Sequence, residues 1–159
     1  MKRRAGGVHV FDTSILMVLD GAPSAIPDAR ARLQQLLEDL ADETIAVTAP
    51  GLAECFGAFL PDGLTVLDMN MEAAEVASRV RSLMWARAKR SKKSTPKEMV
   101  RVDALILATA IAHKATAFYT TDEWFSGVVG ELGLPIEVRG LPPLRPVQLP
   151  MALEEPGED

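Results

Sequence analysis

The chain has one cysteine, few aromatic residues and no long apolar run. A single cysteine, Cys55, cannot form an internal disulfide bond, which fits a reducing compartment and makes Cys55 a small core residue rather than a nucleophile. Every apolar run is shorter than the ~18 residues that indicate a membrane span. The basic residues 2–4 are not followed by the apolar segment and cleavage site of a signal peptide. We therefore expect a soluble protein of the cytoplasm.

What is present indicates one globular domain. The length of 159 residues is enough for a single hydrophobic core, and 48% hydrophobic with 25% charged residues is ordinary for a folded soluble protein. We expect this domain at residues 1–140. Residues 141–159 are rich in proline and then acidic, which predicts a solvated tail, with docking on the domain or on a partner as the alternative.

Short apolar segments alternate with segments of helical spacing. The expected strands are residues 8–11, 44–47, 65–67, 117–120 and 136–138. The expected helices are residues 28–40, 50–60 and 71–90. A further helix is expected to begin after Thr95 as its cap, with Pro96 in its first turn and Glu98 three residues after the cap, and to run towards His113. This alternation predicts an α/β fold with a mainly parallel sheet.

The charge is distributed unevenly. Residues 79–101 contain nine basic residues and one acid, a net +8, while the rest of the chain carries 8 basic and 21 acidic residues, a net -13. Such a segment attracts a polyanion, and a solvated helix face followed by a charged loop explains it equally well. The candidate contacts are Arg87, Lys89, Arg90, Lys92, Lys93 and Lys97.

Four acids are expected to meet at one place. Asp12 and Asp122 each follow an expected strand, and Glu54 lies in the first turns of the helix after residues 44–47. Ligands of parallel sheets bind beyond the carboxyl ends of the strands, where these positions meet. Asp103 lies in an apolar helical segment, where an acid is costly without a cation or donors. A divalent ion such as Mg²⁺ would relieve the repulsion among such acids.

Each acid also has a structural explanation when it is taken alone. Asp12 and Asp122 could cap helices or form turns, and Glu54 could be a solvated helix residue. Asp103 could pair with Arg101 or a lysine. The convergence of separate strand ends and one helix start favours a shared site over four unrelated explanations.

The sequence resembles the PIN-domain nucleases in four motifs that occur in order. They are VFDTS at residues 10–14, APGLAE at 49–54, VDALILATA at 102–110 and TTDEWF at 120–125. Among these nucleases, the chain is most similar to the VapC-type toxins of bacterial toxin–antitoxin pairs. Their last motif often has a non-aromatic residue where this chain has Trp124, and here the basic stretch and the proline-rich tail are longer.

The resemblance implies a Rossmann-like, three-layer α/β/α domain with Mg²⁺- or Mn²⁺-dependent endoribonuclease activity. It implies that Asp12, Glu54, Asp103 and Asp122 are the catalytic metal ligands, and that Ser14 or Thr120 orients them or the attacking water. It also implies a homodimer and a small antitoxin protein as partner. The basic stretch would then contact RNA phosphates, and Trp124 would stack on an unpaired base. For Trp85, packing in the core or between copies is the expectation.

Three other interpretations remain open. The chain could be a catalytically silent RNA-binding module with the same fold, or a PIN nuclease of general RNA processing. It could also be a phosphotransfer domain in which Asp12 accepts the phosphoryl group. That chemistry needs a lysine at the end of a later strand, and no such lysine is evident. His9 and His113 are expected to be structural or surface residues.

Overall fold

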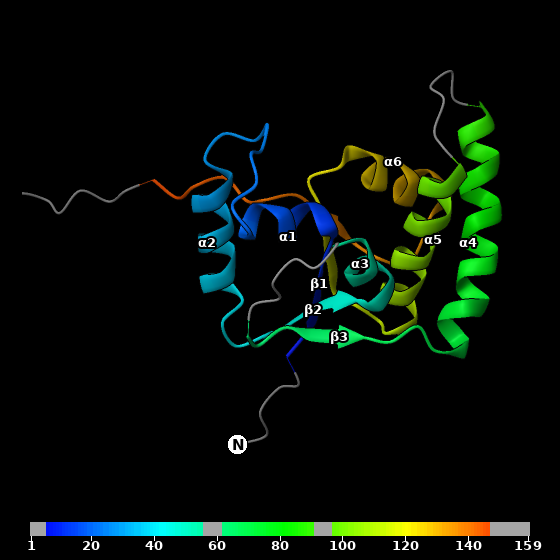
Figure 1. Ribbon diagram of the computed structural model, residues 1–159, viewed down its shortest axis with the longest axis horizontal. Helices are drawn as coiled ribbons and strands as arrows, with labels where there is room; N and C mark the ends of the chain where they lie inside the picture. The colour runs from blue at the N-terminus through cyan, green and yellow to red at the C-terminus, as the bar shows by residue number, and fades with distance from the viewer. Residues whose placement is uncertain (1–5, 56–61, 91–96, 147–159) are drawn as a thin grey trace, which may run out of the picture.

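The computed structural model describes residues 6–55, 62–90 and 97–146, and its centre is a five-stranded sheet in which every neighbouring pair is parallel (Figure 1). The strand order is β3-β2-β1-β4-β5. The strands are β1 (Val8–Phe11), β2 (Thr44–Thr48), β3 (Thr65–Leu67), β4 (Ala117–Tyr119) and β5 (Val138–Arg139). The chain builds the β1-β2-β3 half first and then crosses to β4, so the order reverses between β1 and β4.

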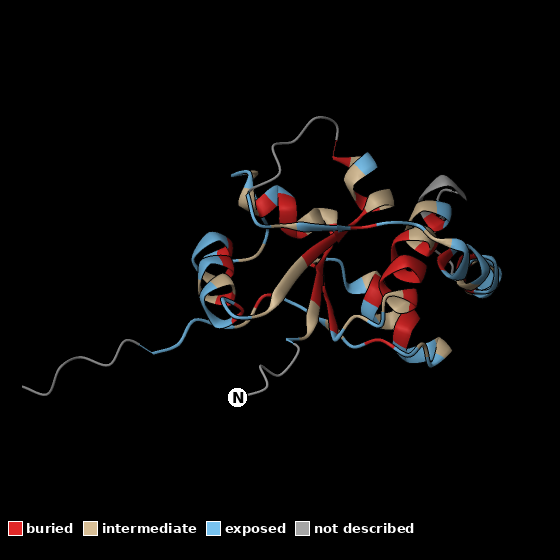
Figure 2. Cartoon of the chain, turned by 90° about the horizontal axis from the view of Figure 1, so that it is seen from below, coloured by how far each residue is buried: buried red, intermediate tan, exposed pale blue. Residues whose placement is uncertain are grey.

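Helices cover both faces of this sheet and complete three layers. They are α1 (Thr13–Leu19), α2 (Ala29–Asp39), α3 (Ala49–Glu54), α4 (Met71–Arg90), α5 (Lys97–Ala112) and α6 (Glu123–Leu132). Buried residues concentrate on the strands and on the inward faces of the helices (Figure 2). Within the described ranges, no helix is long and apolar enough to cross a membrane.

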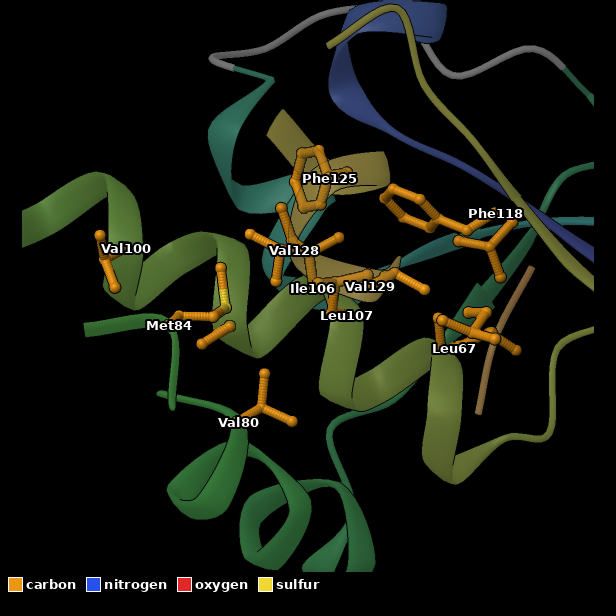
Figure 3. Close-up of a cluster of buried hydrophobic side chains, with 14 of the residues drawn as sticks. Leu67, Val80, Met84, Val100, Ile106, Leu107, Phe118, Phe125, Val128 and Val129 are labelled. Carbon is orange, nitrogen blue, oxygen red and sulfur yellow. The ribbon is translucent and has the colours of Figure 1, made fainter. Parts of the chain in front are cut away.

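Alternation along the strands separates two apolar clusters. Val10 and Phe118 point to one face, where they join α4, α5 and α6. Phe11 and Tyr119, the next residues along, point to the other face, where they join α1 and α2. In the first cluster, Met84 of α4 packs with residues of α5, β4 and α6 (Figure 3). The labelled side chains are Leu67, Val80, Met84, Val100, Ile106, Leu107, Phe118, Phe125, Val128 and Val129.

Most predicted elements are confirmed, and the differences lie at their ends. β1, β3 and α4 have the predicted bounds, whereas β5 lies later than the predicted 136–138. The helix expected at 50–60 is the short α3, which ends at Glu54 with Cys55 as its C-cap. The predicted cap of α5 lies outside the described residues. The short helix α6 was not predicted. It begins after Asp122, whose carboxylate accepts the Trp124 N–H at 2.9 Å, and ends at Gly133 with φ +60°.

The segment expected to be a solvated tail begins by packing on α2. Leu141 is buried in the cluster of α1 and α2. The Gln35 side chain donates to the Pro143 carbonyl at 3.0 Å and accepts the Arg145 N–H at 2.9 Å, and Arg145 pairs with Asp39 at 2.6 Å. Residues 141–145 therefore lie against α2, which is the docking on the domain given as the alternative, while residues 143–145 stay exposed to solvent. Residues 147–159 lie outside the described part.

Candidate functional site

The switch point of the sheet places two of the predicted acids next to each other. β1 and β4 are neighbours, and the chain leaves both at the same edge. The Asp12 N–H extends this pairing by donating to the Tyr119 carbonyl at 2.9 Å. Ligands bind at such a point because the chain diverges there to opposite sides of the sheet.

Two hydroxyl groups hold the carboxylate of Asp12. Ser14 Oγ donates to Asp12 Oδ2 at 3.0 Å, and Thr120 Oγ1 donates to the same oxygen at 2.9 Å. Ser14 Oγ also accepts the Thr121 N–H at 3.0 Å, which ties the loop after β4 to α1. Burial raises the pKa of Asp12, which is 6% exposed, while these hydroxyls and the nearby N–H groups of Thr13 and Ser14 lower it. Asp12 occupies the N-cap position of α1, but its side chain accepts no capping hydrogen bond.

Thr13 connects the first helix to Glu54. Its Oγ1 donates to Glu54 Oε2 at 3.0 Å and lies 3.4 Å from the Gly51 carbonyl. Burial raises the pKa of Glu54, the Thr13 hydrogen bond lowers it, and the charge of Asp12 raises it. Glu54 is the last residue of α3, and it lies near enough to Asp12 for the charge of one carboxylate to act on the other.

Asp103 is the electrostatic centre of the group. Burial, together with the charges of Asp12, Glu54 and Asp122, raises its pKa to about 7. The indole N–H of Trp124 lowers it: Nε1 is buried, lies close to this carboxylate, and has no partner within hydrogen-bond geometry. Among the described side chains, no cation forms an ion pair with Asp103. The alternative of a pair between Asp103 and Arg101 is therefore wrong for the described residues.

Asp122 completes the set and has a second role. It is the most exposed of the four acids and caps α6 through the Trp124 N–H. Its own N–H donates to Thr120 Oγ1 at 3.0 Å. Thr120 therefore touches both Asp12 and Asp122. The capping explanation for Asp122 is correct, and it coexists with the electrostatic effect of Asp122 on Asp103.

Trp124 is fixed from the side opposite the acids. The Arg87 guanidinium lies over its ring, 4.4 Å from the centroid, and forms an ion pair with Glu131. Arg90 pairs with the same Glu131 at 3.3 Å. The ring expected to stack on a base is thus half-buried and already stacked on a cation.

The other predicted RNA contacts are only partly described. Lys89 and Arg90 are exposed near the end of α4. Lys92 and Lys93 lie outside the described residues, and Lys97 begins α5 with an undescribed side chain. Neither histidine belongs to the acidic group: His9 is buried in β1, where burial lowers its pKa, and His113 bonds to the Asp68 carbonyl at 2.9 Å.

The donor set fits a hard divalent ion that keeps part of its water shell. All four groups are carboxylates, and the charges that act on Asp103 all come from acids. In the described ranges, no three His, Cys, Asp or Glu side chains are arranged as a ready-made metal site. Mg²⁺ is usually bound through one or two carboxylates, waters and substrate phosphates rather than a complete protein cage.

Sequence reasoning missed Thr13. Its neighbours Asp12 and Ser14 were both candidates, and a third hydroxyl or acid at the same strand end was the available signal. The bond from Thr13 to Glu54 spans 41 residues, so only the fold reveals it.

Comparisons with known proteins support the fold. No protein-family model matches the sequence, and no curated protein matches it. Among solved structures, the chain is similar to a chain of VapBC2 from Rickettsia felis, a structure that also contains a DNA fragment from the promoter. The TM-score is 0.59 and the sequence identity is 18%, and the match covers 84% of this chain and 98% of that chain. It is also similar to a chain of FitAcB from Neisseria gonorrhoeae, with a TM-score of 0.54, 21% identity, and coverage of 82% and 95%. At these identities the likeness is one of fold, and it confirms the predicted three-layer α/β class with a mainly parallel sheet.

Proposed function

We propose that this chain is an endoribonuclease of the PIN type that depends on Mg²⁺ or Mn²⁺ and acts as the toxin of a toxin–antitoxin pair. The observation that carries the proposal is the convergence of Asp12, Glu54, Asp103 and Asp122 at the switch point without a described cation to neutralise them. Acids held together in this way bind divalent ions and, through them, phosphates.

The residues divide the work by their exposure and partners. Asp12 and Asp103 are the more buried acids and would hold the metal, with Glu54 and Asp122 as further ligands. Ser14 and Thr120 fix the Asp12 carboxylate. A bound metal would supply an activated water and neutralise charge on the phosphate. Whichever of Asp122 and Glu54 is left free of the metal would accept the proton of that water, since both are more accessible than Asp12.

The toxin role and the partners rest on the structural neighbours. VapBC2 and FitAcB are toxin–antitoxin complexes, so a small antitoxin protein is the proposed partner of this chain. A homodimer in the cytoplasm is the proposed form. The basic residues at the end of α4, with Lys92, Lys93 and Lys97, would bind the RNA backbone through contacts that weaken as salt rises.

The proposal is tested by Asp12→Asn and, separately, Asp103→Asn. Each variant should lose at least about 100-fold in Mg²⁺-dependent cleavage of single-stranded RNA, because even residues that only support metal ligands cost 10–100-fold when changed. The matched control is Asp20→Asn, an exposed acid at the other end of α1, which should cleave like the parent. Circular dichroism checks that all variants fold.

A metal titration separates the nuclease from a silent RNA-binding module. Calorimetry should detect Mg²⁺ binding to the parent and not to Asp12→Asn. A folded Asp12→Asn protein that cleaves RNA as fast as the parent contradicts the proposal. A parent that binds RNA but neither Mg²⁺ nor Mn²⁺ is the silent module.

A further inference from the structure

A cavity between α4 and α5 lies outside the acidic site and joins an aromatic ring to two arginines. Its lining residues are Arg81, Ser82, Trp85, Val100 and Arg101, and its volume is about 240 Å³. Pockets for drug-sized ligands are usually about 300–1,000 Å³, so this space suits one small planar group.

The spacing on α4 makes a continuous strip of cations and one ring. Arg81, Trp85 and Lys89 are four residues apart, so they lie above one another on one side of the helix. The Lys89 ammonium is 5.5 Å from the centroid of the Trp85 ring. Trp85 is half-buried and packs against the core cluster, which fixes the ring where it lines the cavity.

Charge distinguishes this cavity from the one beside Asp122, which also contains two arginines. There Arg139 is held by Glu137 at 2.7 Å, and Asp122 and Glu123 are part of the lining. The described lining of the Trp85 cavity contains no carboxylate, and neither Arg81 nor Arg101 pairs with a described acid. It is therefore the cavity suited to an anion with an aromatic part.

The first turns of α5 connect this cavity to the acidic site. Arg101 lines the cavity, and Asp103, two residues later, faces the other acids from nearly the opposite side of the helix, about 200° around its axis. A strand that touches both has to pass around the first turns of α5. We infer that the cavity of Arg81, Ser82, Trp85, Val100 and Arg101 is a subsite for one unpaired base of single-stranded RNA, stacked on Trp85 with flanking phosphates on the two arginines. The inference rests on the proposed function, and it adds to the packing of Trp85 against the core that was expected.

The test uses Trp124→Phe, which leaves Trp85 as the sole tryptophan of the chain. A fluorescein-labelled oligouridylate is titrated in EDTA, so that neither metal nor cleavage contributes. Trp85 fluorescence should be quenched saturably at the concentrations where anisotropy reports binding. Trp85→Leu, measured by anisotropy, should weaken binding about 10-fold or more, and Trp85→Phe should restore much of it.

The arginines are tested with charge-matched pairs. Arg81→Gln with Arg101→Gln should weaken binding and lower the slope of log affinity against log salt by about 1.4, since each contact to a single strand contributes ~0.7. The control is Arg30→Gln with Arg79→Gln, two exposed arginines of α2 and α4 that do not line the cavity. An equal effect of the control pair overturns the subsite, because it would show only a general field.

Other outcomes also decide. If RNA binds without quenching the fluorescence of Trp85, the subsite is overturned. It is also overturned if light scattering shows a dimer that dissociates in Trp85→Leu, because the cavity is then an interface between copies of the chain. If the parent still cleaves RNA with Mg²⁺ in these cases, the proposed nuclease stands. If it neither binds nor cleaves RNA, both fail. Quenching without cleavage supports the subsite and rejects the nuclease.

Discussion

The two charged regions of the chain are built in opposite ways. The acids of the site come from four separate segments, which the pairing of β1 with β2 and β4 and the packing of α3 on α5 bring together. Of the described basic side chains between residues 79 and 101, all but Arg101 follow one another along α4. The acids raise the pKa of Asp103, whereas Arg87 and Arg90 are neutralised by their shared partner Glu131. Uncompensated charge, as in the four acids or in Arg81 and Arg101, indicates a ligand site, whereas compensated charge, as in Arg87 and Arg90, indicates a structural role.

Apart from changes to the acids themselves, the largest expected effect comes from removing the hydroxyl that joins two of them. In Thr120→Val, the Asp12 carboxylate keeps only the Ser14 donor and the Asp122 N–H loses its acceptor, so both acids are held less firmly. Mg²⁺ affinity and RNA cleavage should fall about 10- to 100-fold. Calorimetry and initial cleavage rates provide the measurements.

Thr121→Val is the matched control, because no described hydrogen bond involves its hydroxyl. It should leave metal affinity and cleavage close to those of the parent. If both variants behave alike, Thr120 does not orient the acids, and the acidic region is no more organised than the basic one.

The site was easier to predict than the way it is held. Asp12 and Asp122 follow strands that read clearly as apolar runs, and parallel strands share a carboxyl edge. Glu54 and Asp103 came from the family resemblance as well as from their place in the chain. The bonds of Thr13 to Glu54 and of Thr120 to Asp12 span 41 and 108 residues, so no local pattern predicts them.

The fold shows the same division between long periodic segments and short ones. α4 spans 20 residues with a repeating apolar side, so its predicted bounds are confirmed. α6 has only 10 residues, and its glycines at 127 and 130 weaken the local preference for a helix, although its polar residues share one side. The docking of residues 141–145 depends on Gln35 and Asp39 of α2, which lie about a hundred positions away in the chain.

The second prediction measures the repulsion among the acids through pH. The folded protein keeps a proton on Asp103 up to about pH 7, whereas the ordinary pKa of this group is 3.8. Between these values the folded state binds more protons than the unfolded chain, so its stability falls as pH rises. The metal-free protein should lose on the order of 1–2 kcal/mol between pH 5 and pH 8, a range reduced for partial exposure of the group.

Asp103→Asn should remove most of this loss and make the metal-free protein more stable than the parent at pH 8. Urea unfolding at both pH values is the measurement, and Asp20→Asn is the control that should keep the pH dependence of the parent. If the free energy of unfolding of the parent instead rises between pH 5 and pH 8, the pKa of Asp103 is not raised by the other acids. The contrast between the two regions would then lose its basis.

The smallest effect belongs to the compensated region. In Arg87→Gln, Trp124 loses the guanidinium that lies 4.4 Å from its ring, and Glu131 keeps only Arg90. The loss of the cation–π contact should destabilise the protein by about 0.5–1 kcal/mol. Arg79→Gln removes the same charge from the exposed side of α4, where no described ring or acid pairs with it, and should change the free energy of unfolding less. Urea unfolding compares the two variants, with emission from Trp124 followed in a Trp85→Phe background. If Arg87→Gln leaves stability unchanged but weakens RNA binding more than Arg79→Gln does, Arg87 is a free cation for RNA, and its charge is as uncompensated as that of the acids.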